Sequence, residues 1–180
     1  MERATCENLV IRPATAADAE EATAYVIRLT SEPNNNIVRD PGQWEMTVEQ
    51  EREFLAKAAD NPDQLFLVAV LEGRIVGSAN ILRRAPLTAR HAATVGLSVD
   101  AAWRRRGIGR ALMTTLLEWA RKQGLRRVEL GVFTRNTVAM GLYLQMGFVV
   151  EGLHRRAYLK QGVWVDEYTM ALLLEPVGSI

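Results

Sequence analysis

Short apolar runs alternate along the chain with stretches in which apolar residues recur every three or four positions. The runs predict strands at residues 9–13, 65–71, 74–82, 92–99, 126–132, 148–150 and 164–173. The longer spacing predicts helices at about 17–28, 47–60, 107–123 and 136–146. The order β-α-α-β-β-β-α-β-α-β-β predicts a mixed α/β sheet with helices on both faces.

Local signals mark several boundaries between these elements. Thr47 and Gln50 have the spacing of a capping box, which predicts a helix start. Glu72 and Gly73 predict a tight turn, and hence a hairpin of the two strands around them. A loop or hairpin containing Gly162 joins the last two strands. The strand–helix–strand portion at 92–132 predicts a right-handed parallel crossover.

The composition indicates one ordinary globular domain over residues 1–180. The chain has 180 residues, of which 48% are hydrophobic and 24% charged, and this excludes a disordered or disulfide-rich protein. The formal charge of +1 supplies no basic excess for nucleic acid or an anionic membrane. Cys6 is the single cysteine, and no Cys/His cluster has metal-ligand spacing, so we expect no bound metal. Without a long apolar run or a signal-peptide pattern at the start, we expect a cytoplasmic protein.

The segment 95–112 carries the clearest chemistry. A strand ends, arginines follow, and glycines open a helix, in a run that includes Arg104, Arg105, Arg106, Gly107, Ile108, Gly109 and Arg110. Amide N–H groups at a helix N-terminus have no intrahelical partner, and the helix dipole adds positive charge there. Glycines let a phosphate approach the backbone closely. The pattern therefore predicts a pyrophosphate site.

The two common nucleotide motifs do not fit this segment. A dinucleotide fingerprint needs a third glycine where Leu112 stands, and no Gly-Lys-Ser/Thr sequence is present for a phosphate loop. A solvated basic loop and a DNA-contacting patch at 104–106 remain alternatives, although the balanced charge argues against the second.

Two blocks together resemble the GCN5-related N-acetyltransferase (GNAT) family. The first is Arg104-x-x-Gly107-x-Gly109 after a strand, and the second is Asn136-x-x-Ala139-x-x-Leu142-Tyr143-x-x-x-Gly147-Phe148. The resemblance covers residues 9–173 and is strongest over 95–148. The closing segment 152–170 is similar to the end of small bacterial members that acetylate amines, amino acids or protein N-termini.

The resemblance implies a mostly antiparallel sheet with one splayed parallel strand pair, and acetyl-CoA as co-substrate. It implies that Leu97 and Val99 bond the pantetheine amides with Ser98 between them, and that residues 104–110 wrap the pyrophosphate. Asn136 and Ala139 join this cofactor-binding set, although Asn136 also suits a plain helix cap. Tyr143 is implied as the general acid that protonates the leaving thiolate. The alternative is a purely structural role as a half-buried aromatic residue of the core.

The implied activity is transfer of an acetyl group to a primary amine of an amino acid, a related small amine or a peptide. A non-catalytic acyl-CoA-binding sensor is the alternative. The general base stays unassigned, with Glu32, His91, Glu129, His154 and Asp166 as weak candidates. The variable segment 31–43 is where relatives select substrates. The strand at 164–173 looks exposed, which predicts pairing across a homodimer.

Two positions depart from the family pattern. Arg105 stands where many relatives have glycine, so we expect a small change in the loop backbone. Gly141 lies inside a predicted helix, where glycine is unfavourable by about 1 kcal/mol relative to alanine.

Overall fold

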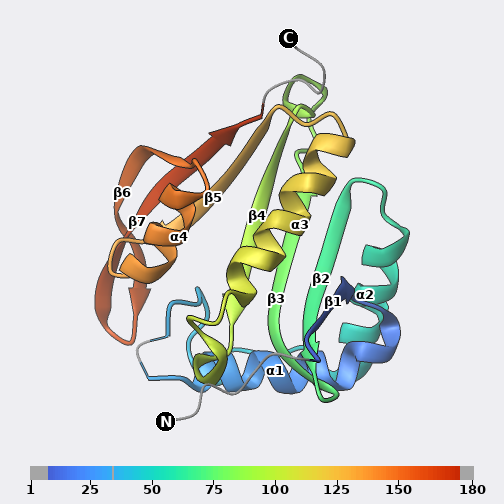
Figure 1. Cartoon of the computed structure of the whole chain (residues 1–180). Coiled ribbons are helices and arrows are strands. Elements are labelled where there is room, and N and C mark those ends of the chain that lie inside the picture. Colours follow the sequence, from blue (N-terminus) through green and yellow to red (C-terminus); the bar gives the residue numbers. More distant parts are fainter. Residues whose placement is uncertain (1–7, 34, 175–180) are drawn as a thin grey trace.

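A computed structural model describes residues 8–33 and 35–174 and shows a seven-stranded sheet in the order β1-β2-β3-β4-β5-β7-β6 (Figure 1). Cys6 lies outside these residues. The strands are β1 (Val10–Pro13), β2 (Gln64–Leu71), β3 (Arg74–Arg83), β4 (Ala92–Val99), β5 (Arg127–Phe133), β6 (Val149–Lys160) and β7 (Val163–Leu173). The α-helices are α1 (Ala19–Ser31), α2 (Val48–Asp60), α3 (Ile108–Lys122) and α4 (Thr137–Gln145). Neighbouring strands are antiparallel except β4 and β5, which are parallel, so the expected fold class and element order are confirmed.

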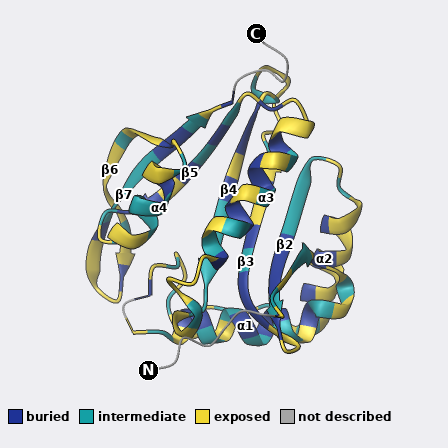
Figure 2. Cartoon of the chain, viewed as in Figure 1, coloured by how far each residue is buried: buried dark blue, intermediate teal, exposed yellow. Residues whose placement is uncertain are grey.

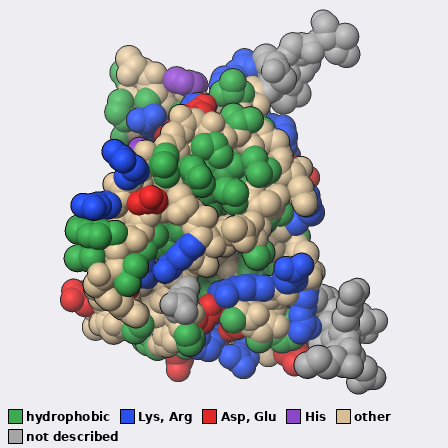
Figure 3. Space-filling view, turned by 90° about the vertical axis from the view of Figure 1, so that its left-hand side faces the viewer, with side chains coloured by type: hydrophobic (Ala, Val, Ile, Leu, Met, Phe, Trp, Pro, Cys, Tyr) green, Lys and Arg blue, Asp and Glu red, His purple; other side chains and the backbone are tan. Residues whose placement is uncertain are grey.

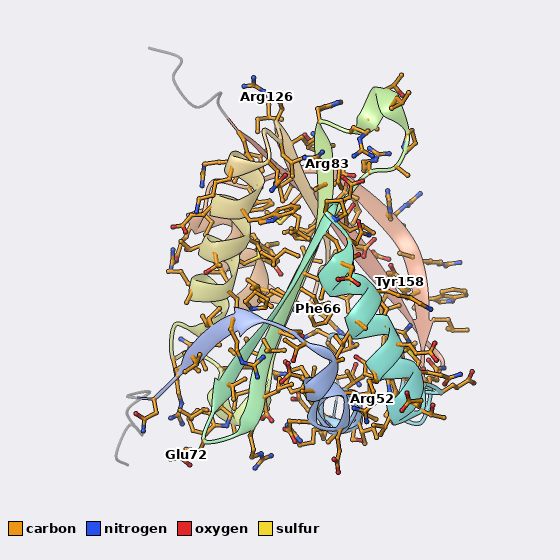
Figure 4. All side chains as sticks on the ribbon, turned by 90° about the vertical axis from the view of Figure 1, so that its right-hand side faces the viewer. Arg52, Phe66, Glu72, Arg83, Arg126 and Tyr158 are labelled. Atoms are coloured by element: carbon orange, nitrogen blue, oxygen red, sulfur yellow. The ribbon has the colours of Figure 1, made fainter. Side chains whose placement is uncertain are left out.

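Helices cover both faces of the sheet. Figure 4 shows α3 on one side of the strands and α2 on the other. Under α3 lies a core that includes Leu112, Leu116, Val128 and Met170. On the opposite face, a second core joins α1 and α2 to the strands β2 and β3; it includes Tyr25, Leu29, Leu55, Val68 and Ile75. Figure 2 shows these buried positions along β2, β3 and β4, whereas β6 is largely exposed.

Most local predictions agree with the structure. Thr47 and Gln50 form the expected capping box, with Gln50 N donating to Thr47 Oγ1 at 3.2 Å. Glu72 and Gly73 both have positive φ, 49° and 79°, as a two-residue hairpin turn requires. The first helix runs to Ser31, three residues beyond the predicted end.

The strand β6 is much longer than the predicted 148–150. It continues to Lys160 and forms a hairpin with β7 that turns at Gln161 and Gly162. The residues of β6 are mostly exposed on both faces, so they carry no apolar alternation from which a strand could be read. A bulge between His154 and Tyr158, with Arg156 at φ 52°, further interrupts the pattern.

The expectation that the strand at 164–173 could pair across subunits is wrong. β7 pairs with β5 on one side and with β6 on the other, so both of its edges are used. The outer edge at this end of the sheet belongs to β6.

Candidate functional site at the fork between β4 and β5

The two parallel strands of the sheet separate after three residue pairs. β4 and β5 pair only where Ala92–Thr94 faces Arg127–Glu129. Beyond this point β4 follows β3 and β5 follows β7, and Figure 1 shows the two strands diverging. Within the described residues, the edges of β4 and β5 that face each other past this point have no strand partner. Their backbone groups are therefore free to bind a ligand.

The N-terminus of α3 lies beside this fork. The added Cβ of a Gly109 substitution would stand 3.5 Å from side-chain atoms of both Leu97 on β4 and Leu142 on α4. Gly107 caps the helix with φ 84°, a left-handed conformation that suits glycine, and no side chain caps the helix. Among the described residues, the first-turn amides of Ile108, Gly109 and Arg110 have no backbone acceptor. The loop thus presents bare N–H groups where the sequence predicted a phosphate site.

The arginines around this loop do not all point to one ligand. Arg104 forms an ion pair with Glu32 and donates from Nε to the Val99 carbonyl at 2.9 Å. Arg106 stacks on the Trp103 ring at 4.6 Å and donates to the Ala102 carbonyl at 3.2 Å. Arg110 donates to the side chain of Gln145 in α4, which ties α3 to α4. The side chain of Ile108 is buried in the core, so only its amide faces the site.

Arg105 adopts the conformation that a glycine would use. Its φ of 61° lies in the left-handed region, so this arginine does use the backbone range that favours glycine. For a residue with a side chain this conformation is unfavourable by about 1–2 kcal/mol.

Residues 97–99 lie on the free part of β4. Leu97 and Val99 pack against the core under α3, and their main chain borders the fork. Ser98 points to the opposite face, where its Oγ lies 3.0 Å from both the Tyr25 hydroxyl and Ser78 Oγ. The main chain of Ser98 pairs with Ser78 of β3, so the backbone groups that face the open edge are those of its neighbours Leu97 and Val99.

The second sequence block forms α4 and the turn before it. Asn136 is the N-cap, with Oδ1 accepting the Ala139 amide at 3.2 Å, so its alternative role as a cap is observed. Tyr143 is 6% exposed and packs on Phe148 with ring centroids 5.8 Å apart. Burial raises the pKa of Tyr143 to about 12. Among the described residues, its hydroxyl has no hydrogen-bond partner, so it remains available as a proton donor.

Several of the weak base candidates have structural partners. Glu32 pairs with Arg104, and Glu129 pairs with Arg127 at 3.0 Å. Asp166 accepts the Arg156 amide at 2.6 Å. His91 is exposed, and its carbonyl accepts the amides of residues 126 and 127. His154 is 61% exposed in its side chain and lies 3.8 Å from Glu167.

Sequence reasoning missed two polar side chains that lie over glycines at the fork. A Cβ on Gly131 of β5 would stand 2.3 Å from Oε1 of Glu167, and a Cβ on Gly96 of β4 would stand 2.6 Å from Oδ1 of Asn80. The available signal was a glycine in the interior of each strand, which marks a close approach by another group.

Sequence reasoning also missed the anchor of the variable segment 31–43. The Lys160 ammonium, at the end of β6, donates to Asn35 Oδ1 at 2.8 Å and to the Ile37 and Arg39 carbonyls. It also pairs with Asp40 at 3.3 Å. The segment between α1 and α2 is thereby fixed against the β6–β7 hairpin.

Two further features bear on the class of protein. Across residues 8–33 and 35–174, no three or more His, Cys, Asp and Glu side chains are grouped so that they could hold a metal ion. No helix in this part of the chain has the length and apolar character needed to span a membrane.

Comparison with known proteins identifies relatives over most of the chain. The model of the acetyltransferase (GNAT) family matches residues 23–148. The L-amino acid N-acetyltransferase AaaT of Escherichia coli is 36% identical over 119 residues, which are 64% of this chain and 72% of that protein. The N-alpha-acetyltransferase RimI of Mycobacterium tuberculosis is 41% identical over 112 residues, which are 61% of this chain and 66% of that protein.

Solved structures agree in fold with this chain. A GNAT-family acetyltransferase from Streptococcus pneumoniae superposes with a TM-score of 0.87 at 32% identity, covering 93% of this chain and 100% of that one. A ribosomal-protein-alanine N-acetyltransferase from Brucella melitensis gives 0.80 at 27% identity, covering 92% and 99%. With its forked parallel pair, its open helix N-terminus and these matches, the chain belongs to the acetyltransferase (GNAT) family.

Proposed function

We propose that this member of the family transfers the acetyl group of acetyl-CoA to the primary amino group of an amino acid, a related small amine or a peptide. The observation that carries the proposal is the fork, where the unpaired edge of β4 lies beside the unpaired amides at the start of α3. Each of these groups corresponds to a different part of the co-substrate.

The residues present fit acetyl-CoA. The first-turn amides of α3 at 108–110 suit the pyrophosphate, because Gly107 and Gly109 leave the backbone accessible. Leu97 and Val99 would hold the pantetheine amides with their main chain, as a further strand pairs with a sheet edge. Asn136 and Ala139 would border the same arm from α4. The bound co-substrate supplies the acetyl group as a thioester, which an amine can attack directly.

Tyr143 is proposed as the general acid. With a pKa of about 12 its hydroxyl keeps its proton throughout the neutral range, so it can protonate the sulfur as the C–S bond breaks. Main-chain N–H groups at 97–99 would stabilise the negative charge that develops on the carbonyl oxygen, by about 3 kcal/mol per donor.

The acceptor class is supported by the relatives and by the variable segment. AaaT is named for L-amino acids and RimI for N-alpha-acetylation, both of which place the amine next to a carboxyl or amide group. The segment 35–40, held by Lys160, borders the β6–β7 hairpin and so lies where it can select the acceptor.

A direct assay tests this proposal against the non-catalytic sensor. Purified protein is incubated with acetyl-CoA and a panel of L-amino acids, small amines and peptides, and free thiol is measured. We expect thiol release with at least one α-amine and an acetylated product by mass spectrometry. Acetyl-CoA binding by calorimetry without thiol release on any acceptor would favour the sensor instead.

We also propose that the protein acts in the cytoplasm, where its donor is available, as a homodimer formed through β6. Figure 3 faces the β6 side of the molecule and shows hydrophobic side chains gathered there. β6 contributes exposed Val149, Val150 and Leu153 to this surface, and its outer edge is unpaired among the described residues. Light scattering coupled to size exclusion should give twice the monomer mass for the wild type. The Leu153→Glu variant should give the monomer mass.

Cell fractionation tests the proposed cytoplasmic location.

A further inference from the structure

We propose that Glu167 holds the amino group of the acceptor and takes its proton, with the Asn80 side chain as a second polar partner. This inference rests on the proposed acetyl transfer and names the residue that activates the amine. It follows from the face of the sheet on which Glu167 lies, from the two glycines at the fork, and from the lack of a Lys or Arg partner among the described residues.

Alternation along the strands places Glu167 on the face opposite Tyr143. In β5, Val128, Leu130 and Val132 belong to the core under α3, so Gly131 faces the other side of the sheet. In β7, Met170 belongs to the same core, which puts Glu167 on the side of Gly131. Tyr143 on α4 belongs to the α3 core. The proposed base and the proposed acid thus lie on opposite faces of the sheet.

Two glycines open this face where β4 and β5 part. The last parallel pair is Thr94 with Glu129. Gly96 and Gly131 each follow two residues later on their strands, where the strands separate. Neither glycine has a side chain to fill the gap between β4 and β5. Instead, a side chain from the neighbouring strand on the other side lies over each glycine. Asn80 of β3 lies over Gly96, and Glu167 of β7 lies over Gly131. The Asn80 amide and the Glu167 carboxylate therefore border the fork. A side chain in place of either glycine would collide with one of these two groups.

The surroundings of Glu167 suit a cationic ligand. The Tyr158 hydroxyl donates to its Oε1 at 3.2 Å, which orients the carboxylate, and Figure 4 shows Tyr158 on the α2 side of the sheet. The side chain of Glu167 is 15% exposed, with His154 Nδ1 3.8 Å from Oε2. Among the described residues, neither Lys nor Arg pairs with Glu167, whereas Arg127 pairs with Glu129 and Arg104 with Glu32. A protonated amine would supply the missing positive charge.

The reaction balances with these two residues. The carboxylate of Glu167 accepts a proton from the acceptor ammonium, which leaves a neutral amine. The amine nitrogen bonds to the carbonyl carbon as the C–S bond breaks, and the Tyr143 hydroxyl gives its proton to the departing sulfur. The nitrogen then loses a second proton to become a neutral amide. Glu167 releases the first proton to water and the second replaces the proton that Tyr143 gave up, so one proton is released per turnover.

The variant Glu167→Gln tests the proposal, with Glu151→Gln as the matched control on β6. Glu151 is paired with Arg127 and lies outside the site. We expect Glu167→Gln to lower kcat/KM for an α-amine by about 100-fold or more and Glu151→Gln to leave it unchanged. Glu167→Asp should recover part of the activity. Acetyl-CoA affinity, measured by calorimetry, should be the same in all variants, which also shows that they fold.

A second acceptor separates proton removal from structural support. A hydrazide analogue that lacks the α-amino group has a terminal nitrogen that is unprotonated at pH 7 and needs no base before attack, so Glu167→Gln should reduce its acetylation much less than that of the amine. Equal losses on both acceptors, or full activity of Glu167→Gln with the amine, would overturn the proposal.

Failure of the proposed acetyl transfer gives a different result. If the wild-type protein releases no thiol with any acceptor, binding of the amine panel to CoA-loaded protein is measured by saturation-transfer NMR. Binding to wild type that Glu167→Gln abolishes would still support Glu167 as the amine site. Equal binding to both proteins would refute it.

Discussion

The carboxylate of Glu167 occupies the space that a side chain on Gly131 would fill. An added Cβ would stand 2.3 Å from Oε1 and 2.7 Å from the carboxyl carbon, so one of the two groups must move. Because the blocking atoms are the end of a flexible side chain, Gly131→Ala should displace the carboxylate without unfolding the strand. We expect a fall in kcat of about 10-fold or more, with acetyl-CoA affinity unchanged. Steady-state kinetics and calorimetry provide the two measurements, and an unaltered kcat would contradict this relationship.

Tyr143→Phe separates the proposed acid from a packing residue. The ring and its contact with Phe148 are kept, so the melting temperature should change little. Loss of the proton donor should lower kcat by about 100-fold and leave the affinity for acetyl-CoA unchanged. In the wild type, the pKa of about 12 predicts that Tyr143 causes no loss of rate between neutral pH and about pH 11. A Tyr143→Phe enzyme with normal turnover would assign the residue to the core alone.

Gly107 and Gly109 should differ in their response to alanine. Gly109 has ordinary backbone angles and room for a Cβ at 3.5 Å, so Gly109→Ala should keep or slightly raise the stability. Gly107 has φ 84°, and Gly107→Ala should reduce the free energy of unfolding by about 1–2 kcal/mol. If the pyrophosphate lies on the α3 amides, both variants bind CoA more weakly. Thermal melts together with calorimetry check this pair, and normal CoA binding by Gly109→Ala would remove the phosphate site from the N-terminus of α3.

Lys160→Met tests the anchor of the segment between α1 and α2. Removing the buried ammonium takes away the cationic partner of Asp40 and the hydrogen bond to the Arg39 carbonyl, so the unfolding free energy should fall by about 3 kcal/mol. The segment should loosen, which raises KM for the acceptor and leaves acetyl-CoA affinity unchanged. Denaturant melts and separate titrations of the two substrates measure this. A change confined to acetyl-CoA would contradict the acceptor-side role.

Asp18 should govern the stability of the N-terminal region in acid. Hydrogen bonds from Arg12 lower the pKa of Asp18 to about 2. A carboxylate with a depressed pKa stabilises the fold above its ordinary range, and this contribution is lost as the pH falls from about 4 to about 2. Asp18→Asn should be less stable by about 1 kcal/mol at pH 7 and should lose this part of the acid dependence. Urea melts at several pH values provide the test.

Local sequence patterns were enough for the order of the elements and for the family. The capping box at Thr47, the turn at Gly73 and the glycines that open α3 depend on hydrogen bonds between residues a few positions apart, so they can be read directly. The two blocks around Gly107 and Tyr143 predicted the family in the same way.

Tertiary structure alone decided which side chains face the acceptor side of the fork. Glu167 reaches Gly131 because β7 inserts between β5 and β6, and Lys160 reaches Asn35 across 125 residues of sequence. The extension of β6 beyond residue 150 was missed because an edge strand exposed on both faces has no apolar alternation. Strand order depends on which apolar faces pack together across the whole chain, and no single segment contains that information.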